Sequence, residues 1–180
     1  MREKLIAALE ESDHLRRGVR ADRLEWLSLH IASAPVVSGR AETLHLLDEA
    51  RSTFVDGHFV AALMVAMAFI EHSVVDELQL LGHINGSPTF SEAIRFAEHK
   101  KVFPPDWLVR AKRLGLRRNP FVHLKKSGHA HSLETRVMEE KRHPNAIMEA
   151  DAKDALDLMY SFFVATLREV DLDKQFSDAN

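Results

Sequence analysis

Apolar residues recur at intervals of three and four positions through most of the 180-residue chain, and this spacing predicts α-helices. We find no sustained alternation of apolar and polar residues bounded by hairpin turns of the Asn-Gly type, which would indicate paired β-strands. The chain has only 7 Gly and 6 Pro, which favours long helices over a turn-rich β fold. We therefore predict an all-α fold.

The pattern predicts a series of helices at residues 2–17, 22–33, 38–55, 58–81, 89–101, from Pro104 onwards, and 145–170. The stretch 58–81 is apolar on nearly every side over its first half, so several neighbours must cover it, and it forms the centre of a bundle. Gly82 follows it at a position suited to a left-handed cap. Thr89 and Glu92 form a capping box at the start of the next helix. Residues 125–144 are polar and predict a mobile loop.

The composition fits a single globular domain, with 46% apolar and 28% charged residues. Within residues 1–180 we expect an N-terminal helical extension at 1–37, a bundle core at 38–170 and a frayed polar tail at 171–180. The chain contains no cysteine, which excludes disulfides, thiol catalysis and cysteine metal sites.

The N-terminal sequence contains acidic residues and lacks the apolar core of a signal peptide, so we do not expect export. The longest apolar run, residues 59–70, is shorter than the roughly 20 residues needed to cross a bilayer. We therefore expect a cytoplasmic protein that does not bind membranes. A net charge of -3 and a pI near 6.4 exclude a global attraction to nucleic acid, so any such binding depends on local charge.

Local positive charge occurs between Asp106 and Glu134, an interval with no acidic residue. Its basic residues are Arg110, Lys112, Arg113, Arg117, Arg118, Lys125 and Lys126. The ordinary interpretation of such a strip is a solvated helix face. The alternative is an RNA- or phosphate-binding surface, whose charge would come from Arg113, Arg117, Lys125 and Lys126.

The strip contains the segment Arg118-Asn119-Pro120-Phe121-Val122-His123. Pro120 suits the first position of a helix, so we predict that a helix starts there with Asn119 as its N-cap. His123 would then lie at a helix N-terminus, where free amides and the helix dipole favour an anion. Arg118 beside it offers a planar fork for phosphate oxygens, and both features keep the imidazole neutral, as a general base requires.

This cassette, Arg118-Asn119-x-x-x-His123, follows a long apolar helix with Ala68-Phe69-Ile70-Glu71 and precedes a final amphipathic helix, and the combination resembles the HEPN superfamily. The motif covers six residues, and the order of helices extends the resemblance loosely over residues 38–170. The resemblance implies an up-and-down helical bundle that forms a homodimer, with two Arg/His cassettes facing a shared cleft. Many members are metal-independent ribonucleases of toxin-antitoxin, phage-defence or RNA-processing systems, and others are silent binding modules.

Carried over to this chain, the resemblance implies three catalytic residues. His123 would assist attack of a ribose 2′-hydroxyl on the adjacent phosphate, Arg118 would stabilise charge on the phosphate oxygens, and Asn119 would orient the pair. Glu71 would support Arg118 from the central helix. Each has a structural alternative: Arg118 paired with a carboxylate, His123 inert, Asn119 only a cap, and Glu71 exposed at the end of an apolar stretch. No cofactor is implied.

Two further groups are weaker candidates. Three histidines could gather a transition metal, but their spacing matches no metal motif, so we predict no metal site at His123, His129 and His131. Three aromatic residues could stack on bases, but anchoring the core is the favoured interpretation of Trp26, Phe103 and Trp107.

The leading functional hypothesis is a HEPN-like, metal-independent endoribonuclease acting as a homodimer. Apolar residues on helices 41–54 and 58–81 also favour a homodimer. The alternative is a catalytically silent HEPN-like module that binds RNA, a nucleotide or a protein partner such as an antitoxin. A third possibility is an unrelated helical regulator in which the cassette is accidental. Convergence of Arg118 and His123 from two subunits on one open cleft would favour the ribonuclease.

Overall fold

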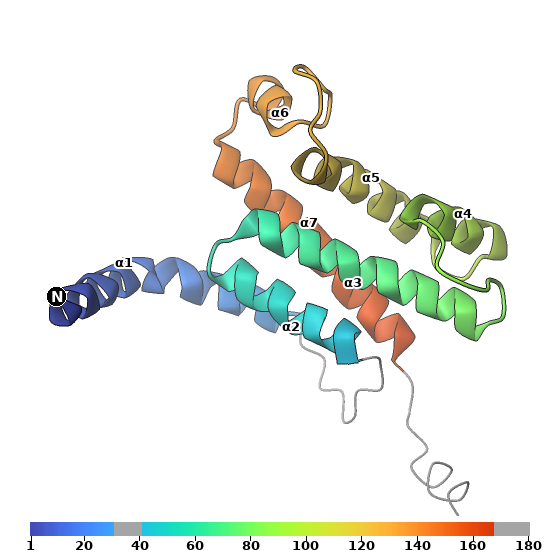
Figure 1. Cartoon of the computed structure of the whole chain (residues 1–180), viewed down its shortest axis with the longest axis horizontal. Helices are drawn as coiled ribbons and strands as arrows, with labels where there is room; N and C mark the ends of the chain where they lie inside the picture. The colour runs from blue at the N-terminus through green and yellow to red at the C-terminus, as the bar shows by residue number, and fades with distance from the viewer. Residues whose placement is uncertain (31–40, 168–180) are drawn as a thin grey trace, which may run out of the picture.

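The structure, a computed structural model, describes residues 1–30 and 41–167, and this part of the chain contains seven helices and no strand. Helices account for 79% of the described residues, so the all-α prediction is confirmed. The helices, shown in Figure 1, are α1 (Arg2–Ser28), α2 (Ala41–Val55), α3 (Phe59–Leu80), α4 (Phe90–Lys100), α5 (Pro105–Val122), α6 (Leu133–Glu140) and α7 (Pro144–Thr166).

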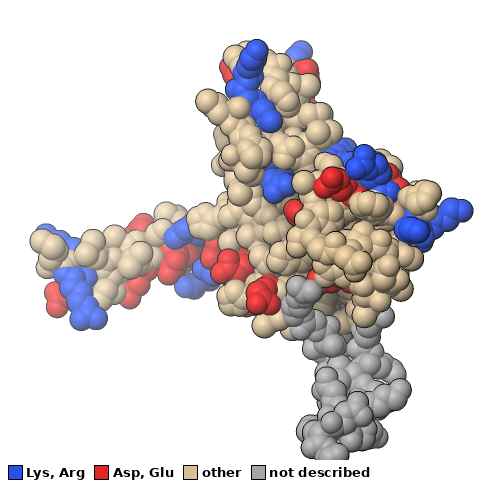
Figure 2. All heavy atoms as spheres, turned by 45° about the vertical axis from the view of Figure 1, so that its right-hand side comes forward, with Lys and Arg blue, Asp and Glu red and all other residues tan. Residues whose placement is uncertain are grey.

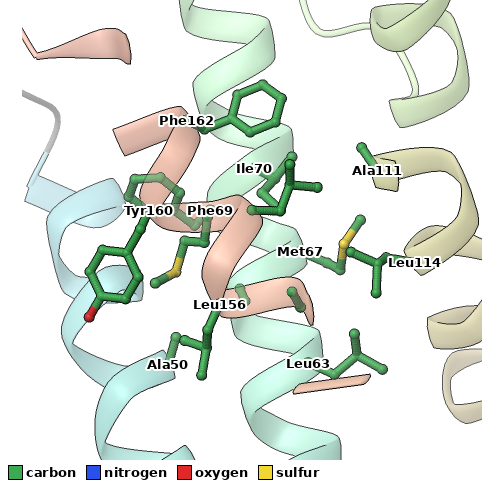
Figure 3. Packing of buried hydrophobic residues seen from close by; sticks show 14 of the residues in the cluster. Ala50, Leu63, Met67, Phe69, Ile70, Ala111, Leu114, Leu156, Tyr160 and Phe162 are labelled. Carbon is green, nitrogen blue, oxygen red and sulfur yellow. The ribbon is translucent and has the colours of Figure 1, made fainter. Parts of the chain in front are cut away.

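Helix α3 lies at the centre of the bundle, as its sequence predicts. Helices α2, α4, α5 and α7 pack against it, and ten of its 22 residues are buried. Figure 3 shows side chains of α3, α5 and α7 gathered in this core. Of the described helices, only α3 is long and apolar enough to cross a membrane, and here it serves as the core helix of the bundle.

The predicted helix boundaries at both ends of the α3–α4 turn are confirmed. Gly82 follows α3 with a φ of +70°, the left-handed conformation that glycine adopts without a Cβ clash. At the start of α4, the Thr89 amide donates to Glu92 Oε2 at 2.9 Å, and the Glu92 amide donates to Thr89 Oγ1 at 3.4 Å. These two bonds form the expected capping box, and the Thr89 hydroxyl and amide together lower the pKa of Glu92.

Helix α1 differs from the prediction, because the two segments expected at 2–17 and 22–33 form one helix as far as Ser28. Gly18, which lies inside it, does not interrupt it. The helix projects away from the bundle and meets it only near its C-terminal end (Figure 1). The predicted cap at residue 38, the tail at 171–180 and the boundary at residue 37 lie outside the described residues.

Two predictions about the second half of the chain are wrong. No helix begins at Asn119-Pro120, because α5 runs through both residues and ends at Val122. Pro120 lies in the last turn of α5, where its missing amide costs one backbone hydrogen bond and the helix is about to end. The expected loop at 125–144 contains α6, which Ser132 caps by accepting a hydrogen bond from the Thr135 amide at 3.3 Å.

Candidate functional site

Most of the basic strip on α5 is paired with an acidic face of α7. Arg110 donates to Asp154 at 2.7 Å and to Asp157 at 2.6 Å, and Arg113 donates to Asp154 at 2.9 Å. Because spacings of three residues place side chains on one helical face, the two charged faces meet along the length of the helices. For Arg110 and Arg113, pairing with carboxylates is therefore the role that the structure shows.

The strip continues into a buried network at Asp151, whose side chain is 1% exposed. Asp151 accepts hydrogen bonds from Arg117 Nη1 at 2.8 Å and from both terminal nitrogens of Arg136, and Arg136 Nε also donates to Glu140 at 3.1 Å. Burial lowers the pKa of Arg136, but the bonds to Asp151 and Glu140 outweigh burial, so the net shift is upwards. The network joins α6 to α5 and α7. Arg117, which the sequence predicted as a possible phosphate-binding residue, is paired with Asp151 in this network.

Arg118 differs from its neighbours on α5. Within the described part of the chain it makes no ion pair and no side-chain hydrogen bond, and its Nε is buried without an acceptor. The expected structural alternative, pairing of Arg118 with a carboxylate, is therefore not seen. Its guanidinium lines a cavity of about 410 Å³ between α3, α4 and α5. The cavity is lined by Glu71, Thr89, Phe90, Ser91, Ile94, Lys112, Gly115, Leu116, Arg118 and Asn119.

The cavity combines cationic, polar and apolar groups. Helix α5 supplies Arg118, Asn119 and Lys112, although the Lys112 ammonium already contacts Glu98 at 2.6 Å. The Phe90 ring packs closely against α5 in the cavity wall, since a Cβ added at Gly115 would lie 3.1 Å from this ring. A bulkier residue than glycine would thus displace the wall of the cavity.

A helix N-terminus does face the Arg118 site, but it belongs to α4. Its N-cap, Thr89, and its first two residues, Phe90 and Ser91, all line the cavity. The capping box satisfies the amides of Thr89 and Glu92, while the described hydrogen bonds leave those of Phe90 and Ser91 without a partner. Free amides at a helix start favour an anion, so α4 provides the environment that the sequence had assigned to Pro120.

His123 does not line this cavity. It is the C-cap of α5, its side chain is exposed, and its amide donates to the carbonyl of Asn119 at 2.8 Å. The C-terminal end of a helix carries partial negative charge, so the predicted electrostatic reason for a neutral imidazole is wrong. Within one chain, Arg118 and Asn119 share a site and His123 lies outside it.

Glu71 reaches the site as predicted, because it lines the same cavity as Arg118. No ion pair joins Glu71 to Arg118 in the described structure, so the carboxylate faces the cavity instead of holding the guanidinium. Glu71 also borders a second cavity of about 420 Å³, which His72 and residues of α2 and the α3–α4 turn line. Direct support of Arg118 by Glu71 stays a prediction.

The remaining candidates divide between the surface and the core. Lys125 and Lys126 follow α5 and make no ion pair within the described residues. The rings of His129 and His131 lie 5.8 Å apart, and no group of three metal-ligating side chains occurs in that part of the chain. The aromatic residues serve the core, with partners as follows: Trp26 against Phe54, and Phe103 and Trp107 against Phe162.

The surface charge does not form a broad basic face in the view of Figure 2, where Lys and Arg lie among Asp, Glu and uncharged residues. Any nucleic-acid contact would therefore be local.

Comparisons of the chain with protein-family models, with curated proteins and with solved structures give no match. The HEPN resemblance therefore rests on the six-residue cassette and the order of the helices.

Proposed function

We propose that the cavity between α3, α4 and α5 binds the phosphate of a nucleotide, free or within single-stranded RNA, with Arg118 as its principal ligand. One observation carries this proposal: Arg118 faces the cavity with a buried Nε that lacks an acceptor, while its neighbours Arg113 and Arg117 are paired. A buried donor without a partner costs about 1–3 kcal/mol. Because this Nε is buried, a phosphate in the cavity would bind the terminal nitrogens of the Arg118 guanidinium, which arginine presents as a planar fork.

The other lining groups favour a nucleotide over bare phosphate. The free amides of Phe90 and Ser91 supply donors to phosphate oxygens, and the amide of Asn119 can donate or accept. Glu71 can only accept when ionised, so it repels a bare anion and suits a ligand that brings its own donors, such as ribose hydroxyls or base amino groups. A volume of about 410 Å³ lies in the range of small-ligand pockets.

In this function the protein is a cytoplasmic, HEPN-like binding module without catalytic activity, which is the alternative that the sequence offered to a ribonuclease.

The test compares Arg118→Ala with Arg113→Ala, which removes the same charge from the same helix. Affinities for AMP and for a fluorescent single-stranded RNA would be measured by calorimetry and anisotropy. Because a bond to a charged group contributes about 1.5–3 kcal/mol, Arg118→Ala should weaken binding roughly ten- to hundred-fold. Arg113→Ala should change it less than about three-fold.

Equal losses in the two variants, or no binding by the wild-type chain, would overturn the proposal. Arg118→Lys separates geometry from charge, since lysine keeps the charge but lacks the fork, and it should recover only part of the affinity. Binding of RNA but not of AMP would assign the site to RNA.

Metal-independent RNA cleavage is the second candidate. It is favoured by the positions of the exposed His123 and Lys126 and the half-buried Lys125 beyond the end of α5, where His123 lies one turn from the cavity-lining Asn119. Because His123 does not line the cavity of its own chain, cleavage requires the imidazole of a second chain to reach a phosphate held by Arg118. This is the homodimeric arrangement that the resemblance implies.

The cleavage hypothesis predicts products with a 2′,3′-cyclic phosphate, no effect of EDTA, and loss of activity in His123→Ala with RNA binding retained. Mixing His123→Ala with Arg118→Ala would restore a fraction of the activity if the two residues act across subunits. Cleavage that disappears with chelator, or that survives both substitutions, would show that this mechanism is wrong. Binding without cleavage would leave the silent module as the function.

A further inference from the structure

The least covered element of the structure is the N-terminal arm, defined here as residues 2–22 of α1. It extends about 30 Å at 1.5 Å per residue and projects beyond the bundle (Figure 1). Its large apolar side chains are exposed, with Leu5 60%, Leu9 61%, Leu15 72% and Val19 48% exposed. An isolated helix is only marginally stable in water, and most helices in proteins are stabilised by packing an apolar face.

These four side chains lie on one face, whereas Ile6, which is 46% exposed, lies outside it. At 100° per residue, Leu5, Leu9, Leu15 and Val19 fall within an arc of about 120°. Trp26 and Leu27 lie in the same arc, and they pack the end of α1 onto the bundle, with the Trp26 ring 5.2 Å from that of Phe54. The exposed face of the arm therefore continues a face of α1 that is already an interface. Two basic residues, Arg16 and Arg23, also fall within this arc.

The charges of α1 indicate what covers this face. Successive blocks at residues 2–4, 10–13, 16–20 and 22–25 carry net charges of +1, -3, +3 and -1. Reversing the order of the two inner blocks reverses their signs, so a second copy of α1 running antiparallel about residue 14 places the acidic block 10–13 against the basic block 16–20. The outer block 22–25 lies where α1 already meets the bundle. A parallel copy would place the acidic block against itself and the basic block against itself.

We propose that the arm pairs with the arm of a second copy of this chain, antiparallel and centred near His14, and so forms a symmetric homodimer. In this arrangement both copies bury the same patch, as two-fold symmetry requires. Figure 2 shows the charged side chains of the projecting helix with uncharged ones among them. Part of the charge is already used within the chain, since Arg20 lies 3.1 Å from Asp56 and Arg16 lies 3.7 Å from Asp13.

The proposed homodimer interface lies on a different surface from the one that the sequence predicted, and it does not depend on the proposed nucleotide site. The sequence placed the interface on residues 41–54 and 58–81, but the structure shows many apolar side chains of α2 and α3 in the intramolecular core. The arm supplies exposed apolar surface that the core does not use.

Light scattering on the full chain at about 100 μM tests the pairing. The wild type should be a dimer and Leu15→Asp a monomer, because the new carboxylate lies on the apolar face, one residue from the midpoint of the paired arms. Val109→Asp is the matched control, since Val109 is 59% exposed on α5 and should not affect assembly. A monomeric wild type, or equal dissociation by both variants, would overturn the proposal. A dimer that persists in Leu15→Asp would place the interface elsewhere and also overturn it.

Cysteine pairing tests the orientation, because the chain has no cysteine of its own. Residues 9 and 19 both lie on the apolar face, and they face each other across two antiparallel arms centred at residue 14. A mixture of Leu9→Cys and Val19→Cys should therefore oxidise mainly to the mixed disulfide. A preference for the two homodisulfides would indicate parallel arms and refute the antiparallel assignment.

Discussion

Replacing Asp151 with alanine should be among the most destabilising single substitutions outside the apolar core. Its side chain is 1% exposed and accepts hydrogen bonds from Arg117 and Arg136, whose side chains are 27% and 9% exposed. Removal of one member of a buried ion pair leaves an uncompensated buried charge and costs about 3–5 kcal/mol. Here, among the described residues, it leaves Arg117 without an ion-pair partner and Arg136 with Glu140 alone.

The magnitude is large for a domain of this size. Globular domains unfold with a free energy of about 5–15 kcal/mol, so the substitution would remove a third or more of that stability in most cases. At about 2–4 °C per kcal/mol for a chain of this length, the midpoint of thermal unfolding should fall by about 6–20 °C. Urea unfolding followed by circular dichroism measures the free energy directly.

Asp157→Ala is the control, because Asp157 pairs with Arg110 but its side chain is 46% exposed, and exposed pairs contribute about 0–1 kcal/mol. Replacing the network with apolar residues, as in Asp151→Leu with Arg117→Met and Arg136→Met, should restore most of the lost stability. If Asp151→Ala lowered the free energy of unfolding no more than Asp157→Ala, the inference that the buried ion pairs of Asp151 stabilise the fold more than exposed pairs do would be refuted.

Two smaller effects follow from single polar groups. Burial raises the pKa of Tyr160, whose hydroxyl has no hydrogen-bond partner among the described residues, so Tyr160→Phe should stabilise the fold by about 1 kcal/mol in urea unfolding. The raised pKa means that stability is intact below about pH 10, the unfolded tyrosine value, and declines above it; the phenylalanine variant should show no such decline. Hydrogen bonds from Thr89 lower the pKa of Glu92, so their contribution is present above about pH 4.3 and lost at lower pH. Thr89→Ala should lower the unfolding temperature at pH 7, and the difference from wild type should shrink in acid; a constant difference would contradict the capping role.

The sequence alone determined the positions of most helices, because helix formation depends on residues three and four apart and on local caps. The apolar run of α3 identified the central helix, and the Thr89–Glu92 pair marked the start of α4. Local signals were ambiguous at Pro120, since proline suits the first turn of a helix and also occurs where a helix ends. Helix α5, whose buried residues include Leu108, Ala111 and Leu114, continues for three residues beyond Asn119. No single local signal indicated this continuation.

A matching signal for the ion pairs was present but not recognised. Basic residues at 110, 113 and 117 and acidic residues at 151, 154 and 157 each occupy one face of a helix, at nearly the same spacing. Recognising their pairing requires knowing that α5 and α7 are neighbours. Arg136 gave less warning, because it lies outside the basic strip of α5.

The tertiary structure decided which cations remain available. Arg117 and Arg118 are adjacent in the sequence and identical in chemistry, but a helix turns about 100° between them. That rotation directs Arg117 towards Asp151 of α7 and Arg118 into the cavity beside α4. The residue type therefore made both arginines candidates for the proposed phosphate site, while packing between helices distant in the sequence determined which of the two is unpaired in the described structure.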